Sequence, residues 1–365
     1  MNKLRVLAML LLVVAAPAPA QLTIEDLVRD AGLRAGDVEM RDVPGWKGAQ
    51  KILVVFGWQE AVEMLQREFP DTEFLVPESS EDAIGLAAQV DAIIGSCDAA
   101  LVAAAKRLVW VQIPWAGVER CLVSPRIASG EVVLTNMQKM SSPVIGEHAV
   151  TLALALSHGL PAQAKAMPSG EWRPDSPAAR AAVPLAGKTM LVLGLGGIGT
   201  ETARRGAALG MRVIGTRNSS REGPSYVDYV GLADEMLDLV PQADVIVNAL
   251  PATDQTRGLL DAEFFAATKR GAYFVNVGRG TTVNTDALLR ALQNGQLGGA
   301  GLDVTDPEPL PPDHPLWQLD NVIITPHIAG RGGERERHLL LLRENLRRYA
   351  AGDALLNVVD PGRGY

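Results

Sequence analysis

The chain has 365 residues, a length that favours two domains of ordinary size. Its residues are 47% hydrophobic and 21% charged, a globular balance that excludes disordered, collagen-like and coiled-coil chains. The formal net charge of −8 argues against broad nucleic-acid binding, which requires a basic surface.

Residues 1–20 have the pattern of a cleaved secretory signal peptide. Lys3 and Arg5 form a positive start, residues 6–16 are an unbroken apolar run, and Ala18 and Ala20 are the small residues that a signal peptidase reads. The run is shorter than the roughly 20 apolar residues that span a bilayer. We therefore expect a periplasmic or secreted protein with no membrane partner after cleavage. A mis-assigned start codon would instead leave the protein in the cytoplasm.

After a weakly patterned segment at 21–49, short β-rich runs alternate with helical runs, as is typical of parallel α/β structure. The first series is expected to hold strands at 51–56, 73–76, 92–95, 108–113 and 131–135, with helices at 59–68, 80–89 and 99–106. An apolar helix at 144–160, which Pro161 is expected to end, and a loop at 167–184 lead to a second series. Its expected elements are strands at 189–193, 212–215, 245–248, 273–277, 301–304 and 322–325, and a last helix at 334–351.

A glycine-rich turn, GLGGIG at 194–199, directly follows the strand at 189–193 and precedes a helical run. In a dinucleotide-binding turn the first glycine permits the bend, and the second lets a pyrophosphate approach the backbone. The third lets the helix pack close to the strand, and the first amides of the helix face the anion. We therefore predict that a dinucleotide is bound by this turn, through Gly194, Gly196, Gly197, Ile198 and Gly199.

The strand that follows the turn bears on the choice of cofactor. It ends in Arg217 and then Asn218 and Ser219, where an NAD enzyme would carry an acidic residue for the ribose hydroxyls. A guanidinium and hydroxyls would bind a 2′-phosphate that a carboxylate would repel. Arg217 and Ser219 therefore favour NADP, with NAD still possible.

Three later strand ends each carry one charged or titratable residue, namely Arg279, Glu308 and His327. In an open parallel sheet, ligands bind at the carboxyl ends of the strands, so these groups are expected to meet at one edge. An arginine can grip a carboxylate through two parallel hydrogen bonds, and a histidine can donate a proton near neutral pH. We expect His148 and His158, on the apolar helix, to be structural.

The two cysteines, Cys97 and Cys121, are too few for a scaffold of several disulfides or for a zinc ribbon, and we expect no metal site. We expect both to be buried thiols, although an oxidising compartment would permit a disulfide between them.

These motifs resemble the D-isomer-specific 2-hydroxyacid dehydrogenase family, which includes glyoxylate/hydroxypyruvate reductases, D-lactate dehydrogenases and 3-phosphoglycerate dehydrogenases. The likeness covers nearly all of residues 50–365 and is most specific in GLGGIG, VNVGRG, LDVTDPEPL with HPLW, and ITPHIAG. It implies two doubly wound, Rossmann-like or flavodoxin-like parallel-sheet domains. The NAD(P)-binding domain at 149–329 would be inserted into a substrate domain made of 21–148 and 330–365. It also implies a homodimer.

The resemblance assigns roles to particular residues. Arg279 would anchor the substrate carboxylate together with backbone amides around Ala116 and Gly117, while His327 would be the acid/base and Glu308 its partner. A carboxylate beside the histidine, rather than the amide of the related formate dehydrogenases, favours a hydroxy-acid substrate. The resemblance also implies that Asp303 lies near the nicotinamide carboxamide. It implies a row of residues along the cofactor, namely Leu250, Pro251, Thr256, Val277, Arg279 and Asp303.

The sequence thus predicts an oxidoreductase that transfers hydride between NADPH and C2 of a small 2-oxo acid, with glyoxylate or hydroxypyruvate as the expected substrate. One alternative is an NAD-dependent enzyme similar to 3-phosphoglycerate dehydrogenase, against which Arg217 argues. A second is a non-catalytic protein that senses a dinucleotide on the same scaffold.

Overall fold

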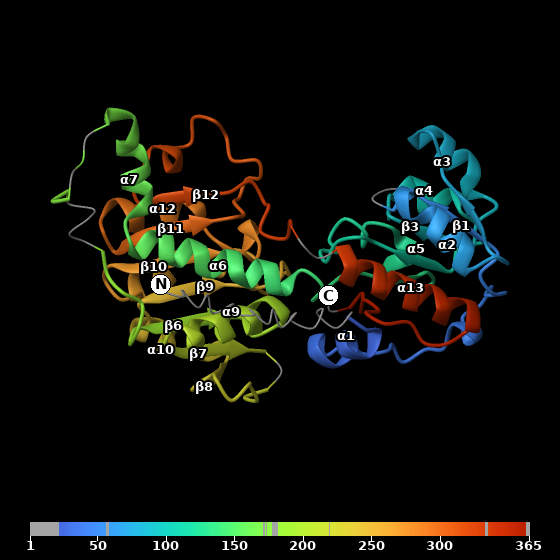
Figure 1. The fold of residues 1–365 in the computed structure, drawn as a ribbon, viewed down its shortest axis with the longest axis horizontal. Helices are drawn as coiled ribbons and strands as arrows, with labels where there is room; N and C mark the ends of the chain where they lie inside the picture. The colour runs from blue at the N-terminus through green and yellow to red at the C-terminus, as the bar shows by residue number, and fades with distance from the viewer. Residues whose placement is uncertain are drawn as a thin grey trace, which may run out of the picture.

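The computed structural model describes residues 22–55, 58–170, 172, 174–176, 182–218, 220–332 and 335–362. The expected signal peptide at 1–20 lies outside these residues. The chain forms two lobes, each built around one parallel sheet (Figure 1). None of the described helices is long and apolar enough to cross a membrane.

The first lobe is built on a five-stranded sheet in the order β2-β1-β3-β4-β5, which is the flavodoxin-like order of a doubly wound fold. Its central strands are buried on both faces, as their continuous apolar runs predict. The strands are β1 (Lys51–Val54), β2 (Glu73–Leu75), β3 (Ala92–Ile94), β4 (Trp110–Gln112) and β5 (Val133–Thr135). The helices after them are α2 (Val62–Glu68), α3 (Ser80–Ala87), α4 (Ala99–Ala104) and α5 (Pro125–Ala128).

Two helices from opposite ends of the chain cover one face of this sheet (Figure 1). Helix α1 (Ile24–Ala31) lies in the segment that has little sequence pattern, and a capping box between Thr23 and Asp26 begins it. Helix α13 (Arg335–Ala351) buries Tyr349 against the strands. The C-terminal helix therefore completes the core of the N-terminal lobe.

The second lobe is built on a seven-stranded parallel sheet in the order β12-β11-β10-β9-β6-β7-β8. Numbered within the lobe, this is the Rossmann order, with its switch point between β6 and β9. The strands are β6 (Thr189–Leu193), β7 (Arg212–Arg217), β8 (Tyr229–Leu232), β9 (Val245–Asn248), β10 (Ala272–Asn276), β11 (Leu297–Leu302) and β12 (Val322–Ile324). Helices pack on both faces, among them α9 (Gly197–Ala208), α10 (Met236–Leu239), α11 (Ala262–Ala267) and α12 (Thr285–Gln293).

The long apolar helix α6 (Ser142–Ser157) lies against the second sheet and against α9. The prediction that Pro161 ends this helix was wrong. The chain turns at Gly159, whose φ of +65° is left-handed, and Pro161 lies in the first turn of the next helix, α7 (Leu160–Ala166). Proline is tolerated there because the first amides of a helix have no partner within it.

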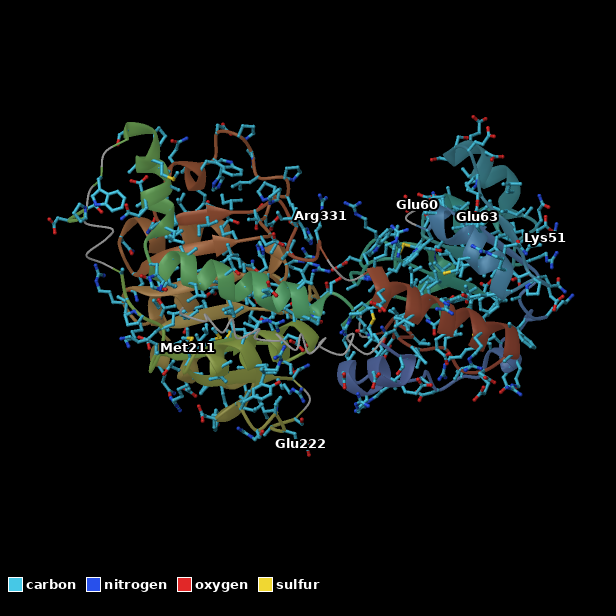
Figure 2. The ribbon with its side chains drawn as sticks, in the orientation of Figure 1. Lys51, Glu60, Glu63, Met211, Glu222 and Arg331 are labelled. Atoms are coloured by element: carbon cyan, nitrogen blue, oxygen red, sulfur yellow. A yellow bond between two sulfur atoms is a disulfide. The ribbon has the colours of Figure 1, made fainter. Side chains whose placement is uncertain are left out.

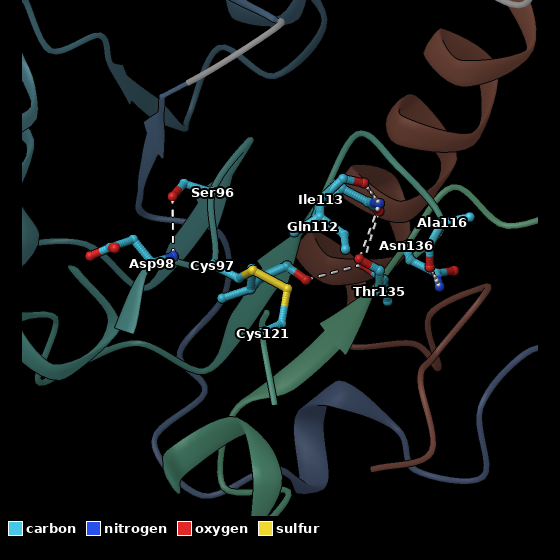
Figure 3. Close-up of a disulfide and its surroundings, with 10 residues drawn as sticks. Ser96, Cys97, Asp98, Gln112, Ile113, Ala116, Cys121, Thr135 and Asn136 are labelled. Carbon is cyan, nitrogen blue, oxygen red and sulfur yellow. Dashed lines mark hydrogen bonds between the residues drawn. A yellow bond between two sulfur atoms is a disulfide. The ribbon is translucent and has the colours of Figure 1, made fainter. Parts of the chain in front are cut away.

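The expectation of two free thiols was also wrong. Cys97 and Cys121 form a disulfide, and both are buried as expected (Figure 3). The bond joins the loop after β3 to the loop after β4. The packing of two separate loops brings the two residues together, which the spacing of 24 residues does not reveal.

Candidate active site

The glycine turn connects β6 to α9 at the switch point of the Rossmann sheet. Gly194 has a φ of +89°, and a Cβ on Gly199 would collide with the carbonyl oxygen of Gly194, so this bend requires both glycines. Within the described part of the chain no side chain caps the first amides of α9, and the space where Gly196 would carry a Cβ is open. Open space beside uncapped amides fits the pyrophosphate of a dinucleotide. Gly197 and Ile198 begin the helix that presents these amides.

Arg217 is the last residue of β7, and its side chain reaches back to the turn. Its Nε donates a hydrogen bond of 3.0 Å to the carbonyl oxygen of Leu195. The guanidinium therefore lies at the strand end where dinucleotide-binding folds hold the adenosine ribose. Ser219, the second residue expected there, lies outside the described residues.

The residues expected on the adenosine side follow β9, which pairs with β6. The Leu250 side chain lies against Gly194, and the Thr256 hydroxyl donates 2.6 Å to the carbonyl oxygen of Pro251, which closes the loop between them. Val277, just past β10, is buried. These four residues therefore line the same sheet edge as the glycine turn.

His327 and Glu308 meet in the structure. The Nδ1 atom of His327 is 2.7 Å from the Oε1 atom of Glu308, with half of the His327 side chain exposed. Because Nδ1 is engaged, Nε2 is the ring nitrogen that can serve a substrate. His327 has a φ of +52°, and its amide donates to the carbonyl oxygen of Asp303, which fixes the unusual backbone at this position.

The buried carboxylate of Asp303 organises the loop that carries His327. It accepts hydrogen bonds from the Thr325 hydroxyl at 2.6 Å, the Ile328 amide at 2.9 Å and the Ala329 amide at 3.0 Å. These bonds hold the chain on both sides of His327. Asp303, which we expect near the nicotinamide carboxamide, thus also shapes the loop that carries His327.

His148 joins this network from α6, although the sequence suggests only a structural role on an apolar helix. Its Nε2 lies 3.0 Å from the Thr325 hydroxyl. That hydroxyl already donates to Asp303, so it must accept from His148, and Nε2 carries the proton. His148 and Thr325 are 177 residues apart, and no sequence pattern pairs them.

Arg279 follows β10, and its guanidinium bridges the two lobes. Its Nε donates 3.1 Å to Oε1 of Glu119, which lies in the loop after β4, and its Nη1 donates to the carbonyl oxygen of Gly278. A Cβ on Gly117 would lie 2.5 Å from Nη2 of Arg279, so the guanidinium lies directly against this loop. No sequence pattern marks Glu119, because the pair forms only when loops of separate lobes meet.

The loop that contains Gly117 presents backbone groups to the same place. The carbonyl oxygen of Ala116 accepts 2.8 Å from Nδ2 of Asn136, which anchors the loop (Figure 3). Among the described residues, no acceptor takes the amide protons of Ala116 or Gly117. Trp115 is 41% exposed, so it lies outside the core.

The His327 and Arg279 positions lie on the side of the second lobe that faces the first. The loops after β10 and β11 touch, since a Cβ on Gly280 would collide with the carbonyl oxygen of Thr305. Figure 2 shows Arg331, shortly after His327, on the edge directed toward the first lobe. The described residues hold no cluster of three or more potential metal ligands.

Comparison with known proteins identifies the family. A family model described as D-isomer specific 2-hydroxyacid dehydrogenase, NAD binding domain, matches residues 150–329. A D-isomer specific 2-hydroxyacid dehydrogenase family protein from Aeromonas salmonicida subsp. salmonicida A449, whose structure is solved, is 32% identical in sequence to this chain. Its TM-score is 0.76, with 86% of this chain and 99% of that one covered. The chain belongs to this family. Membership makes it an NAD(P)-dependent D-2-hydroxyacid dehydrogenase and confirms the predicted family and enzyme class.

Two further relatives bear on the finer predictions. An NADPH-dependent glyoxylate/hydroxypyruvate reductase from Sinorhizobium meliloti, solved with NADP and sulfate, is 27% identical with a TM-score of 0.72. The match covers 87% of this chain and all of that one. D-3-phosphoglycerate dehydrogenase from Archaeoglobus fulgidus is 30% identical over 83% of this chain. The chain covers only 57% of that relative's length.

Proposed function

We propose that this dehydrogenase reduces a small 2-oxo acid, glyoxylate or hydroxypyruvate, with NADPH as the hydride donor. The observation that carries the proposal is the 2.7 Å contact between His327 Nδ1 and Glu308 Oε1 at the edge where the Rossmann sheet binds its ligands. A histidine fixed in this way at Nδ1 leaves Nε2 to protonate an oxygen. That geometry suits reduction of a ketone or aldehyde group.

Each candidate residue has one task in this reaction. The bound cofactor supplies hydride to C2 of the substrate. Nε2 of His327 donates a proton to the oxygen on C2, while Glu308 holds the orientation of the ring through Nδ1. Arg279 and the amides of Ala116 and Gly117 bind the carboxylate, which sets C2 within reach of His327.

Arg217 supports NADPH as the cofactor, because its guanidinium at the end of β7 would bind a 2′-phosphate. The NADP complex of the Sinorhizobium meliloti reductase is consistent with this choice. The alternative, an NAD enzyme acting on 3-phosphohydroxypyruvate, is motivated by the likeness to 3-phosphoglycerate dehydrogenase. This chain has Arg217 rather than an acidic residue at the end of β7, which argues against that alternative.

We also propose the organisation predicted from the sequence. The NAD(P)-binding domain is residues 149–329, inserted into a substrate domain made of 21–148 and 330–365, and the enzyme acts as a homodimer. The disulfide between Cys97 and Cys121 supports export, because disulfides persist in oxidising compartments. N-terminal sequencing of the protein from fractionated cells should find a start at Gln21 in the periplasmic or secreted fraction. An intact Met1 in the cytosol would refute export.

The activity is tested by following NADPH and NADH oxidation with glyoxylate, hydroxypyruvate, pyruvate and 3-phosphohydroxypyruvate. We expect NADPH with glyoxylate or hydroxypyruvate to give the highest kcat/KM. Arg217→Asp should shift the preference toward NADH by repelling the 2′-phosphate. Preference for 3-phosphohydroxypyruvate with NADH would favour the alternative, and absence of turnover with any 2-oxo acid would refute the proposal.

A further inference from the structure

Two basic side chains, those of Lys139 and Arg217, lie beside the glycine turn. Lys139, in the loop between β5 and α6, packs over Gly197, where a Cβ would be 3.0 Å from Cγ of Lys139. Arg217 approaches the same turn from the end of β7 through its bond to Leu195. Arg34 follows α1, and its charge acts on Lys139 together with that of Arg217.

The position of Lys139 is unusual for a lysine. Its φ of +71° is left-handed, a conformation that favours glycine. Its Nζ donates 2.6 Å to the carbonyl oxygen of Gly32 at the end of α1, which leaves two of its three N–H donors. A long side chain kept in a conformation that suits glycine points to a task for that side chain.

Lys139 and Arg217 have no acidic partner among the residues that the structure describes. No ion pair joins Lys139, Arg34 or Arg217 to a carboxylate within the described ranges. Burial, and then the nearby charges of Arg34 and Arg217, lower the pKa of Lys139. Like charges held together in this way repel one another, and a bound dianion would offset that repulsion.

We propose that Lys139 joins Arg217 to bind the ribose 2′-phosphate of NADPH, so that the cofactor links the two lobes. The inference rests on the proposed use of NADPH. Arg217 sets the position, because the end of the strand after the glycine turn faces the adenosine ribose. Gly197 matters as well, because a side chain there would collide with Lys139 and Ser142.

The test measures equilibrium dissociation constants of NADPH and NADH by fluorescence titration of the full chain. Lys139→Met keeps the apolar stem and removes the charge, and we expect it to weaken NADPH binding roughly 10-fold. NADH binding should stay within twofold of wild type. Lys139→Arg should keep most of the preference for NADPH. Lys106→Met is the matched control, since Lys106 is an exposed lysine of the same lobe, and it should change neither constant.

Two outcomes would overturn the inference. An equal loss of NADPH and NADH affinity in Lys139→Met would place the contact at the shared pyrophosphate, and no loss would remove Lys139 from the site. A double variant of Lys139 and Arg217 tests whether both side chains bind the same phosphate. If they do, their separate effects on the dissociation constant of NADPH are non-additive. The proposed function fails separately, if wild-type protein binds neither cofactor.

Discussion

The two lobes of this dehydrogenase contribute different kinds of groups to the candidate site. The seven-stranded lobe provides a glycine turn and three side chains that can bind or move charge, each just past the end of a strand. The five-stranded lobe provides backbone amides at Ala116 and Gly117 and the charges of Glu119 and Lys139, all carried on loops. The reactive side chains therefore lie in loops that follow strands of the Rossmann sheet, whereas the groups of the five-stranded lobe lie in loops whose position depends on packing between the lobes.

This difference predicts how variants in each lobe should behave. Changes to His327 and Glu308 of the seven-stranded lobe should reduce kcat. Changes to loop residues of the five-stranded lobe should alter ligand affinity or the stability of that lobe. A loop variant of the five-stranded lobe that lowers kcat without changing ligand affinity or stability would contradict this difference between the lobes.

The largest effect is expected for His327→Ala. Loss of the proton donor should lower kcat by roughly 10²- to 10⁴-fold, while the dissociation constant of NADPH stays unchanged. Steady-state kinetics and a binding titration measure the two quantities. His158→Ala, an exposed position at the end of α6, is the control and should retain full activity. A near-normal kcat in His327→Ala would remove this residue from the mechanism.

The double variant Cys97→Ser, Cys121→Ser should lower the free energy of unfolding of the five-stranded lobe by about 3 kcal/mol, because the open chain regains conformational freedom. Urea denaturation with and without dithiothreitol measures this. The reduced wild-type protein should match the double variant. Equal stability of the oxidised and the double-variant protein would contradict a disulfide in this lobe.

Glu119→Gln should lower KM for the 2-oxo acid by up to about fivefold, because an exposed ion pair contributes up to about 1 kcal/mol. In the structure Glu119 occupies Nε of Arg279, and a substrate carboxylate has to compete with it. Glu131→Gln, whose ion pair with Arg126 is elsewhere in the same lobe, is the control. A raised KM would mean that Glu119 aids binding instead.

The smallest effect is expected at Glu235, whose pKa is lowered to about 2 by hydrogen bonds from Arg221, Tyr229 and the Leu232 amide. Because the pKa of Glu235 is lower in the folded protein, its ionised carboxylate stabilises the fold at pH values above the ordinary pKa of 4.5. This stabilisation is lost as the pH falls toward 2. The stability difference between wild type and Glu235→Gln should therefore be smaller at pH 3 than at pH 7. A difference that does not change with pH would contradict this assignment.

The parts of the fold that follow from local rules could be predicted from the sequence. Buried strands gave apolar runs, and the turn at 194–199 needs glycines at fixed positions, so both were visible. The sequence patterns do not predict strand β8 or the short helices α1, α5, α7, α10, α11 and α12. Strand β11 was placed too late, because Gly298 and Gly299 hide its first half; Gly299 there faces Leu156 of α6. The role given to Pro161 was reversed, since proline also suits a helix start.

The candidate site was visible only in part for a related reason. His327 and Glu308 belong to motifs that can be read along the chain. The contacts of Arg279 with Glu119, and of His148 with Thr325, join residues 160 and 177 positions apart. Such pairs depend on how loops and a connecting helix pack, and no local pattern encodes that packing. Lys139 was missed because nothing in its neighbourhood marks a lysine that reaches the opposite lobe.

The most direct test of the proposed activity is to identify the product that the purified enzyme forms from hydroxypyruvate with NADPH. Chiral chromatography would identify the product, and absorbance would measure the NADPH consumed. We expect D-glycerate alone, formed in an amount equal to the NADPH oxidised. Binding of NADPH without reduction of hydroxypyruvate or glyoxylate, or formation of the L-isomer, would contradict it.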